Sequence, residues 1–241
     1  MKTSVDEIAD GVYRLSTFVR DVEPDGITFN QFLLQADQPL LFHCGQRWLF
    51  DEVSHTAARV MRLDRLRWVS FGHLEADECG SLNDWLAAAP DAQVAHGAVG
   101  CEVSIDDLAV RRPVRLDDDE KIDLGGKRVR HLQTPHVPHG LDACLLFEER
   151  TRTLLCGDLF AHTGEGPPTR DDDVVERALA GRTPYGSICL SPGTAPTIRR
   201  LADLEPATLA IMHGSSFDGD CQEALEALAD GYQRRLERQV G

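Results

Sequence analysis

The sequence has no long apolar run, no closely spaced pair of cysteines and no excess of basic residues. No apolar stretch is long enough to cross a bilayer. The opening residues, MKTSVDEIAD, also lack the apolar centre of a signal peptide. These absences argue against membrane insertion and export, and we therefore expect a cytoplasmic protein.

The cysteines are odd in number and scattered, without any C-x-x-C pair. Neither a disulfide framework nor a zinc knuckle is indicated by such spacing. A reducing compartment fits this pattern best. The seven positions are Cys44, Cys79, Cys101, Cys144, Cys156, Cys189 and Cys221.

Charge excludes two further classes of partner. The chain has 40 acidic residues against 25 Lys and Arg, which gives a formal net charge of −15. An acidic field repels phosphate groups. We therefore expect no nucleic-acid partner and no binding to anionic membrane surfaces.

What the sequence does contain suits one mixed α/β domain. With 241 residues, 42% of them hydrophobic, the chain can bury a substantial core, and we expect residues 1–241 to form a single domain. Residues 163–197, rich in Gly, Pro and charge, are expected to form a surface excursion with the potential to act as a lid. Apolar patterning and turn signals predict strands at 11–15, 27–35, 40–43, 66–71, 143–147, 153–156 and 208–212, and helices at 48–61, from Ser81 onward and at 221–240.

A cluster of potential metal ligands directly follows the predicted strand at 66–71. His73, Glu75 and Asp77 are spaced two residues apart. In an extended segment such positions point to the same side, so His73 and Glu75 could hold one metal while Asp77 reaches a second. Taken alone, the cluster is equally consistent with a solvated acidic loop.

Three later residues strengthen the metal hypothesis. His139, Asp158 and His213 all lie at the ends of predicted strands. Loops at strand ends converge on one rim of a sheet-based fold, so distant residues can meet there. The carboxylate of Asp158 is suited to bridge two cations held roughly 3.5–4 Å apart.

The ordered set of motifs resembles the metallo-β-lactamase superfamily, in particular its diiron branch of flavodiiron proteins and oxygen-binding diiron proteins. The hairpin at 30–45 also matches, so the resemblance covers nearly the whole chain. It implies an αββα sandwich with a non-haem diiron site at one rim. The motifs that carry it are His73-Leu-Glu75-Ala-Asp77, His139-Gly-Leu-Asp142, Gly157-Asp158 and His213-Gly214.

The resemblance also implies a role for each ligand. His73, Glu75 and His139 would hold the first iron, Asp77 and His213 the second, and Asp158 would bridge them. Glu75 replaces the second His of the zinc hydrolases in this superfamily. Carboxylate oxygens favour harder ions, so iron is expected, with Mn or Zn as alternatives.

Departures from the diiron pattern raise further expectations. Glu78 stands where the flavodiiron motif usually has His, and we expect it to act as an extra ligand or a proton donor. His136 is an alternative to His139 as ligand, but Gly140 and Leu141 after His139 follow the diiron pattern, so His136 is expected to be a nearby proton source. His43, where the superfamily hairpin often ends in Asp, is expected to support the site through hydrogen bonds.

The resulting functional hypothesis is a diiron protein that binds or reduces O2 or NO. No flavodoxin-like domain follows His213 in the sequence, so an external redox donor is expected for a reductase, and a signalling partner for an oxygen sensor. The alternative is a dinuclear metallo-hydrolase, in which a metal-bridging hydroxide attacks an ester, thioester or lactone.

Overall fold

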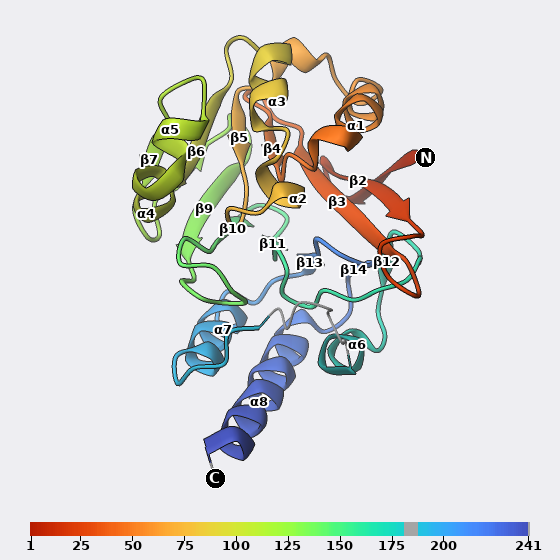
Figure 1. The fold of residues 1–241 in the computed structure, drawn as a ribbon, viewed down its shortest axis with the longest axis vertical. Coiled ribbons are helices and arrows are strands. Elements are labelled where there is room, and N and C mark those ends of the chain that lie inside the picture. The colour runs from red at the N-terminus through yellow and green to blue at the C-terminus, as the bar shows by residue number, and fades with distance from the viewer. Residues whose placement is uncertain (181–187, 241) are drawn as a thin grey trace.

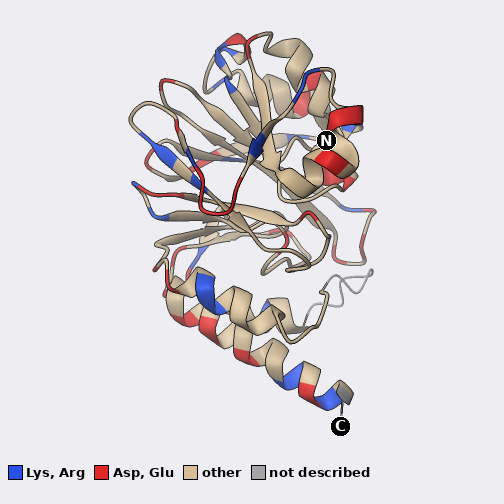
Figure 2. Ribbon diagram, turned by 90° about the vertical axis from the view of Figure 1, so that its left-hand side faces the viewer, with Lys and Arg blue, Asp and Glu red and all other residues tan. Residues whose placement is uncertain are grey.

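The chain folds as two β-sheets packed face to face, with helices on both outer sides (Figure 1). The structure is a computed structural model that describes residues 1–180 and 188–240. Seen from the side, the two sheets form the middle layers and the helices the outer ones (Figure 2). The αββα sandwich predicted from the sequence is confirmed.

The first sheet contains the N-terminal strands in chain order, β1-β2-β3-β4-β5-β6-β7. Neighbouring strands are antiparallel from β1 to β4 and parallel from β4 to β7. The strands are β1 (Thr3–Ala9), β2 (Val12–Val19), β3 (Ile27–Leu34), β4 (Leu40–Phe42), β5 (Trp68–Ser70), β6 (Gln93–Gly97) and β7 (Val114–Leu116).

The second sheet has the order β12-β14-β13-β11-β10-β9-β8. The predicted hairpin between β10 and β11 is present, and a parallel pairing joins β11 to β13. The strands are β8 (Lys121–Asp123), β9 (Arg128–Gln133), β10 (Cys144–Glu148), β11 (Thr153–Leu155), β12 (Thr169–Arg170), β13 (Thr208–Ala210) and β14 (Ser216–Phe217).

Helices follow from amphipathic segments that cover the outer faces of both sheets. Those before residue 110 lie on the side of the first sheet, and α6, α7 and α8 on the side of the second (Figure 1). They are α1 (Phe50–Ala57), α2 (Ala76–Cys79), α3 (Leu82–Ala88), α4 (Ala98–Gly100), α5 (Asp106–Leu108), α6 (Val174–Ala180), α7 (Thr194–Ala202) and α8 (Cys221–Val240). Short 3-10 turns span Arg47–Leu49 and Leu63–Arg65, and a π-helical turn spans Cys101–Ile105.

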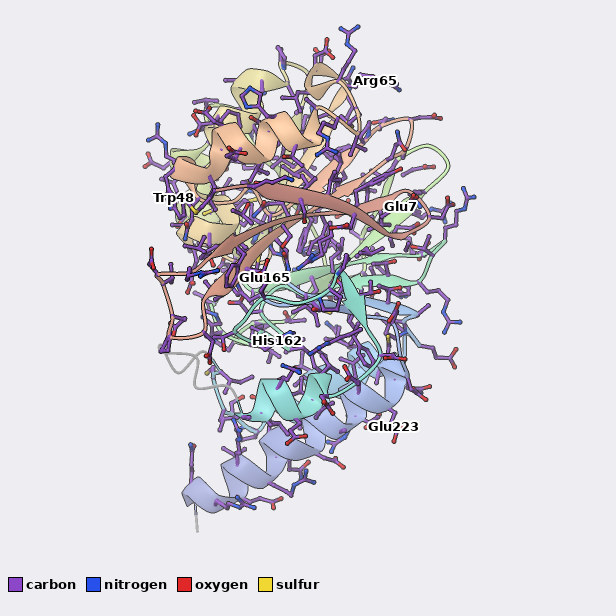
Figure 3. All side chains as sticks on the ribbon, turned by 90° about the vertical axis from the view of Figure 1, so that its right-hand side faces the viewer. Glu7, Trp48, Arg65, His162, Glu165 and Glu223 are labelled. Carbon is purple, nitrogen blue, oxygen red and sulfur yellow. The ribbon has the colours of Figure 1, made fainter. Side chains whose placement is uncertain are left out.

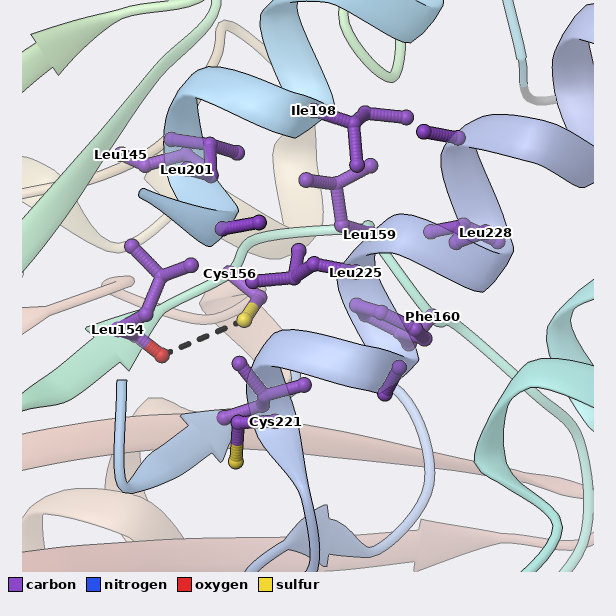
Figure 4. Packing of buried hydrophobic residues seen from close by; sticks show 14 of the residues in the cluster. Leu145, Leu154, Cys156, Leu159, Phe160, Ile198, Leu201, Cys221, Leu225 and Leu228 are labelled. Carbon is purple, nitrogen blue, oxygen red and sulfur yellow. Dashed lines mark hydrogen bonds between the residues drawn. The ribbon is translucent and has the colours of Figure 1, made fainter. Parts of the chain in front are cut away.

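Buried side chains form three apolar layers, as two sheets and two helical layers require. Phe32, Phe42 and Leu146 belong to the layer between the sheets. Trp85 belongs to the layer under α1 and α3. The third layer lies between the second sheet and helices α7 and α8, where Leu225 is fully buried (Figure 4). Burial of apolar surface in all three layers fixes the two sheets against each other.

Several local predictions need correction. The predicted helix at 48–61 is shorter: its first turn is 3-10 and α1 ends at Ala57. Ser81 is the N-cap residue of α3 as expected, but its side chain makes no capping hydrogen bond. The segment 163–197 is not an irregular excursion, because it contains β12, α6 and the start of α7. Its residues 181–187 lie outside the described part of the chain, and the lid remains a prediction.

Among the helices of the described residues, none combines the length and the apolar character needed to cross a bilayer.

Candidate metal centre

All six predicted metal ligands lie in loops or short turns that follow strands. Each therefore sits where a strand ends and its backbone leaves the sheet, which is where side chains of distant segments can converge. His73 follows β5, Glu75 precedes α2, Asp77 lies within α2, His139 lies between β9 and β10, Asp158 follows β11, and His213 follows β13.

Four of the six residues offer ligand atoms that all lie within 4.8 Å of one another: His73, Glu75, His139 and Asp158. The Nε2 atom of His139 is 2.9 Å from Oδ2 of Asp158. The Nε2 atom of His73 is 3.4 Å from Oε1 of Glu75. These are the residues that the sequence assigned to the first ion and to the bridge.

Of the remaining two ligands, His213 faces the other oxygen of the same carboxylate and also lies beside Asp77. Nε2 of His213 lies 3.2 Å from Oδ2 of Asp77 and 3.3 Å from Oδ1 of Asp158. The two oxygens of Asp158 thus face different sets of side chains, one toward His139 and the other toward His213. This is the arrangement that a bridging carboxylate needs.

The segment that carries the acidic cluster is not extended throughout, as the sequence argument assumed. Glu75 has extended backbone angles, but residues 76–79 form the single helical turn α2. Asp77 therefore reaches His213 from a helix and not from a continuous strand-like row. The turn also brings Glu78 into the protein interior, where it is fully buried.

Neighbouring charges shift the pKa values of several of the six residues. Burial lowers the pKa of His73, but Glu78, Glu75 and Asp158 outweigh burial and raise it to about 12. Burial likewise opposes, but does not prevent, a strongly raised pKa at His213, which faces Asp158 and Asp77. Burial raises the pKa of Asp158, while His139 and His213 hold it well below its usual range. The carboxylates therefore attract positive charge into the centre of the cluster.

The donor atoms fit a pair of cations. Nε2 of His73 and Oδ1 of Asp158 are buried and have no hydrogen-bond partner among the described residues. Buried polar atoms without partners are costly, and an ion would satisfy both. Among the described residues, His73, Glu75, His139 and Asp158 offer ligand atoms close enough together to hold one ion.

The ring of His213 is fixed by backbone groups that the sequence argument did not identify. Its Nδ1 lies 2.8 Å from the carbonyl oxygen of Thr28, which leaves Nε2 free to face the carboxylates. The backbone N–H of His162 donates to the carbonyl of His213 at 3.0 Å, and the N–H of Ser215 donates to Nε2 of His162 at 3.2 Å. Figure 3 labels His162 in the loop after β11. These contacts depend on tertiary packing, so sequence spacing carried no signal for them.

Two residues predicted to act as proton sources occupy different surroundings. His136 is exposed in the loop that carries His139, with a positive φ of 65°. Glu78 is buried behind His73, with Oε1 3.2 Å from Nδ1 of that ring. The roles of both in proton transfer remain predictions.

Comparison with known proteins identifies similar sequences. The family model described as "ODP family beta lactamase" matches residues 27–180, more than half of the chain. A curated relative from Synechocystis sp., "Putative diflavin flavoprotein A 3", is 27% identical over 226 residues. That match covers 89% of this chain but 36% of the relative, so the chain spans about a third of that protein.

Solved structures share the fold. A mutant of the flavo di-iron protein from Thermotoga maritima is similar with a TM-score of 0.81 and 21% identity, covering 95% of this chain and 62% of that one. The rubredoxin oxygen:oxidoreductase from Desulfovibrio gigas is similar with a TM-score of 0.78 and 17% identity, covering 97% and 62%. At these identities the likeness establishes the architecture.

Proposed function

The chain belongs to the ODP family of β-lactamase-fold proteins within the diiron branch of the metallo-β-lactamase superfamily, and from this membership we propose that it binds two iron ions and binds or reduces O2 or NO. The observation that carries the proposal is the convergence of ligand atoms on the two oxygens of Asp158. The names of the relatives, which include a flavo di-iron protein and an oxygen:oxidoreductase, support it.

In this proposal each ion has its own side of the site. His73, Glu75 and His139 would hold the first ion, Asp77 and His213 would hold the second, and Asp158 would be shared by both. Three imidazoles and three carboxylates make an oxygen-rich donor set, which suits iron better than zinc. None of the relatives named above supports Mn or Zn.

The chain's own residues prepare the site for a small diatomic ligand. A pair of ferrous ions supplies electrons to such a ligand when bound. Glu75 is exposed, which keeps the site open to solvent on that side, whereas His73 and His213 are buried. His136, exposed on the neighbouring loop, is the proposed proton source.

Sustained reduction requires a partner. Reduction of O2 to water needs more electrons than two ferrous ions hold, so a redox donor protein must replenish them. A chain that binds O2 without such a donor would act as a sensor read by a signalling partner. The two roles share the same site and differ in whether turnover follows binding.

Metal analysis of protein purified without air tests the proposal. We expect about two irons per chain and a new near-ultraviolet or visible absorption band when O2 is admitted. Turnover with NADH and a reductase would then assign the reductase role, and binding without turnover the sensor role. Two zinc ions with no spectral response to O2, together with hydrolysis of chromogenic esters or lactones, would instead assign the hydrolase function.

A further inference from the structure

Glu78 lies beside the candidate metal centre but behind one of its proposed ligands. Its side chain is completely buried. Its carboxylate faces the side of the His73 ring opposite to the metal ligands, because Oε1 lies 3.2 Å from Nδ1, while Nε2 points toward Glu75 and Asp158. Glu78 therefore cannot be a ligand of an ion that is bound at Nε2 of His73.

The second oxygen of this carboxylate has two neighbours of its own. Oε2 accepts a hydrogen bond of 2.6 Å from the backbone N–H of His73 and lies 3.3 Å from Nδ1 of His43. His43 is itself fully buried, and its ring packs against Phe42 at a centroid distance of 4.2 Å. Oε2 is therefore placed by the backbone of His73 and by the ring of His43, which is not a proposed metal ligand.

The backbone leaves room for this arrangement at one glycine. A Cβ atom at Gly72 would come within 2.8 Å of Oε2 and 3.2 Å of Oε1 of Glu78. A real Cβ atom essentially never makes a contact as short as 2.8 Å, so a side chain at position 72 would force the carboxylate or the backbone to shift. Gly72 thus forms part of the cradle that keeps Glu78 beside His73.

We propose that Glu78 is a positioning residue for the first metal ion: it accepts the Nδ1 proton of His73 and fixes Nε2 as the metal-binding atom. A carboxylate behind a ligating histidine fixes the tautomer and raises the basicity of the ring. His213 is held differently, by the neutral carbonyl of Thr28. The two proposed ions therefore differ in the group that supports their histidine ligand. The second ion would have Asp77, His213 and Asp158 as its protein ligands. This inference rests on the proposed dinuclear site.

The test compares stepwise Co²⁺ binding to the metal-free wild-type chain and to the Glu78→Gln variant, followed by visible absorbance in competition with a chelator. Glutamine keeps the size of the side chain but removes its charge. We expect one of the two binding steps to weaken by roughly 10–100-fold, as measured for partners behind metal-bound histidines, and the other to stay within about threefold. A control, Glu148→Gln, removes another fully buried carboxylate, held by Thr151 in the hairpin between β10 and β11, and is expected to leave both steps unchanged.

The outcomes separate this inference from the proposed function. Two Co²⁺ ions bound equally by wild type and Glu78→Gln, or equal weakening of both steps, would overturn the positioning role alone. A wild-type chain that binds no Co²⁺ would overturn the dinuclear site, and the inference with it.

A measurement on the wild-type chain covers the case in which the variant does not fold. In the Zn²⁺-loaded protein, ¹⁵N-histidine NMR is expected to show the proton of His73 on Nδ1, coupled to a metal-bound Nε2. A proton on Nε2, with the ion on Nδ1, would contradict the inference.

Discussion

At the scale of single residues, Asp158 is the side chain on which the site depends most. One of its oxygens lies 2.9 Å from His139 and the other 3.3 Å from His213. Loss of its charge removes a ligand from both ions at once. We therefore expect Asp158→Asn, purified without air, to retain at most about one iron per chain. Metal analysis checks this, with Asp118→Asn, an exposed partner of Arg200, as the control. Retention of two irons by Asp158→Asn would refute the bridging role of Asp158.

His96 provides a test of pH dependence away from the ligands. Burial, followed by the charge of His131, lowers the pKa of His96 to about 4. Between pH 6.5 and 4 the unfolded chain therefore binds a proton that the folded chain does not, so stability falls as pH falls. Over this range His96 lowers the free energy of unfolding by at most about 3 kcal/mol. Urea unfolding of His96→Gln should show a weaker loss over this range, and His55→Gln, on the exposed side of α1, should follow wild type. If the free energy of unfolding fell with pH equally in His96→Gln and in wild type, His96 would not be the group with the lowered pKa.

The sequence identified the side chains that converge in the candidate site better than it identified the groups that support them. Each of these side chains lies in a connection next to a strand, and strand ends can be recognised from apolar runs and turn residues. The contact between Glu78 and His73 could not be predicted, because it depends on the helical turn α2 rotating Glu78 inward. The carbonyl of Thr28 behind His213 carries no side-chain signal at all.

At the scale of elements, long periodic segments were predicted well and short ones poorly. The closing helix spans Cys221–Val240 as expected, because its apolar spacing continues over many turns. α2 has four residues and α6 has seven, too few for a pattern to stand out from loop residues. The segment that contains α6 was taken as irregular for that reason, although Val174 and Ala178 are buried in the layer against α8.

The packing of α8 predicts a measurable cost for truncation. Leu225 is fully buried between α8 and the second sheet (Figure 4). Leu225→Ala should lower the free energy of unfolding by about 2–5 kcal/mol, since the lost methyl groups leave a cavity. Urea denaturation measures the change. Glu223→Ala, on the exposed side of the same helix, should stay within about 0.5 kcal/mol of wild type. A similar small change for Leu225→Ala would mean that α8 does not pack as described.

At the scale of the whole molecule, the candidate metal site lies between the two halves of the sandwich. His73 and Asp77 follow β5 of the first sheet, whereas Asp158 and His213 follow strands of the second. Ions held by both groups would therefore stabilise the packing of the sheets against each other. We accordingly propose that residues 1–241 unfold as one unit, as a single domain requires.

Metal binding and pH should be linked in a defined direction. In the metal-free chain, neighbouring carboxylates raise the pKa of His73 to about 12 and also raise the pKa of His139 and His213. These raised values stabilise the folded state fully below the unfolded pKa of about 6.5, and the stabilisation is lost as pH rises toward the folded values. The metal-free chain should therefore be less stable at pH 9 than at pH 6.

Bound metal ions should reverse this trend, because they take the place of the protons. At pH 6 each ion must displace protons from the three histidines, whereas at pH 9 fewer protons compete and binding tightens. Free metal at 100 times its dissociation constant adds about 2.7 kcal/mol to the free energy of unfolding. Urea unfolding of metal-loaded and chelator-treated protein should consequently show a larger difference at pH 9 than at pH 6. An equal difference at both values would mean that the ions do not compete with protons at these histidines, and would place the metal elsewhere in the protein.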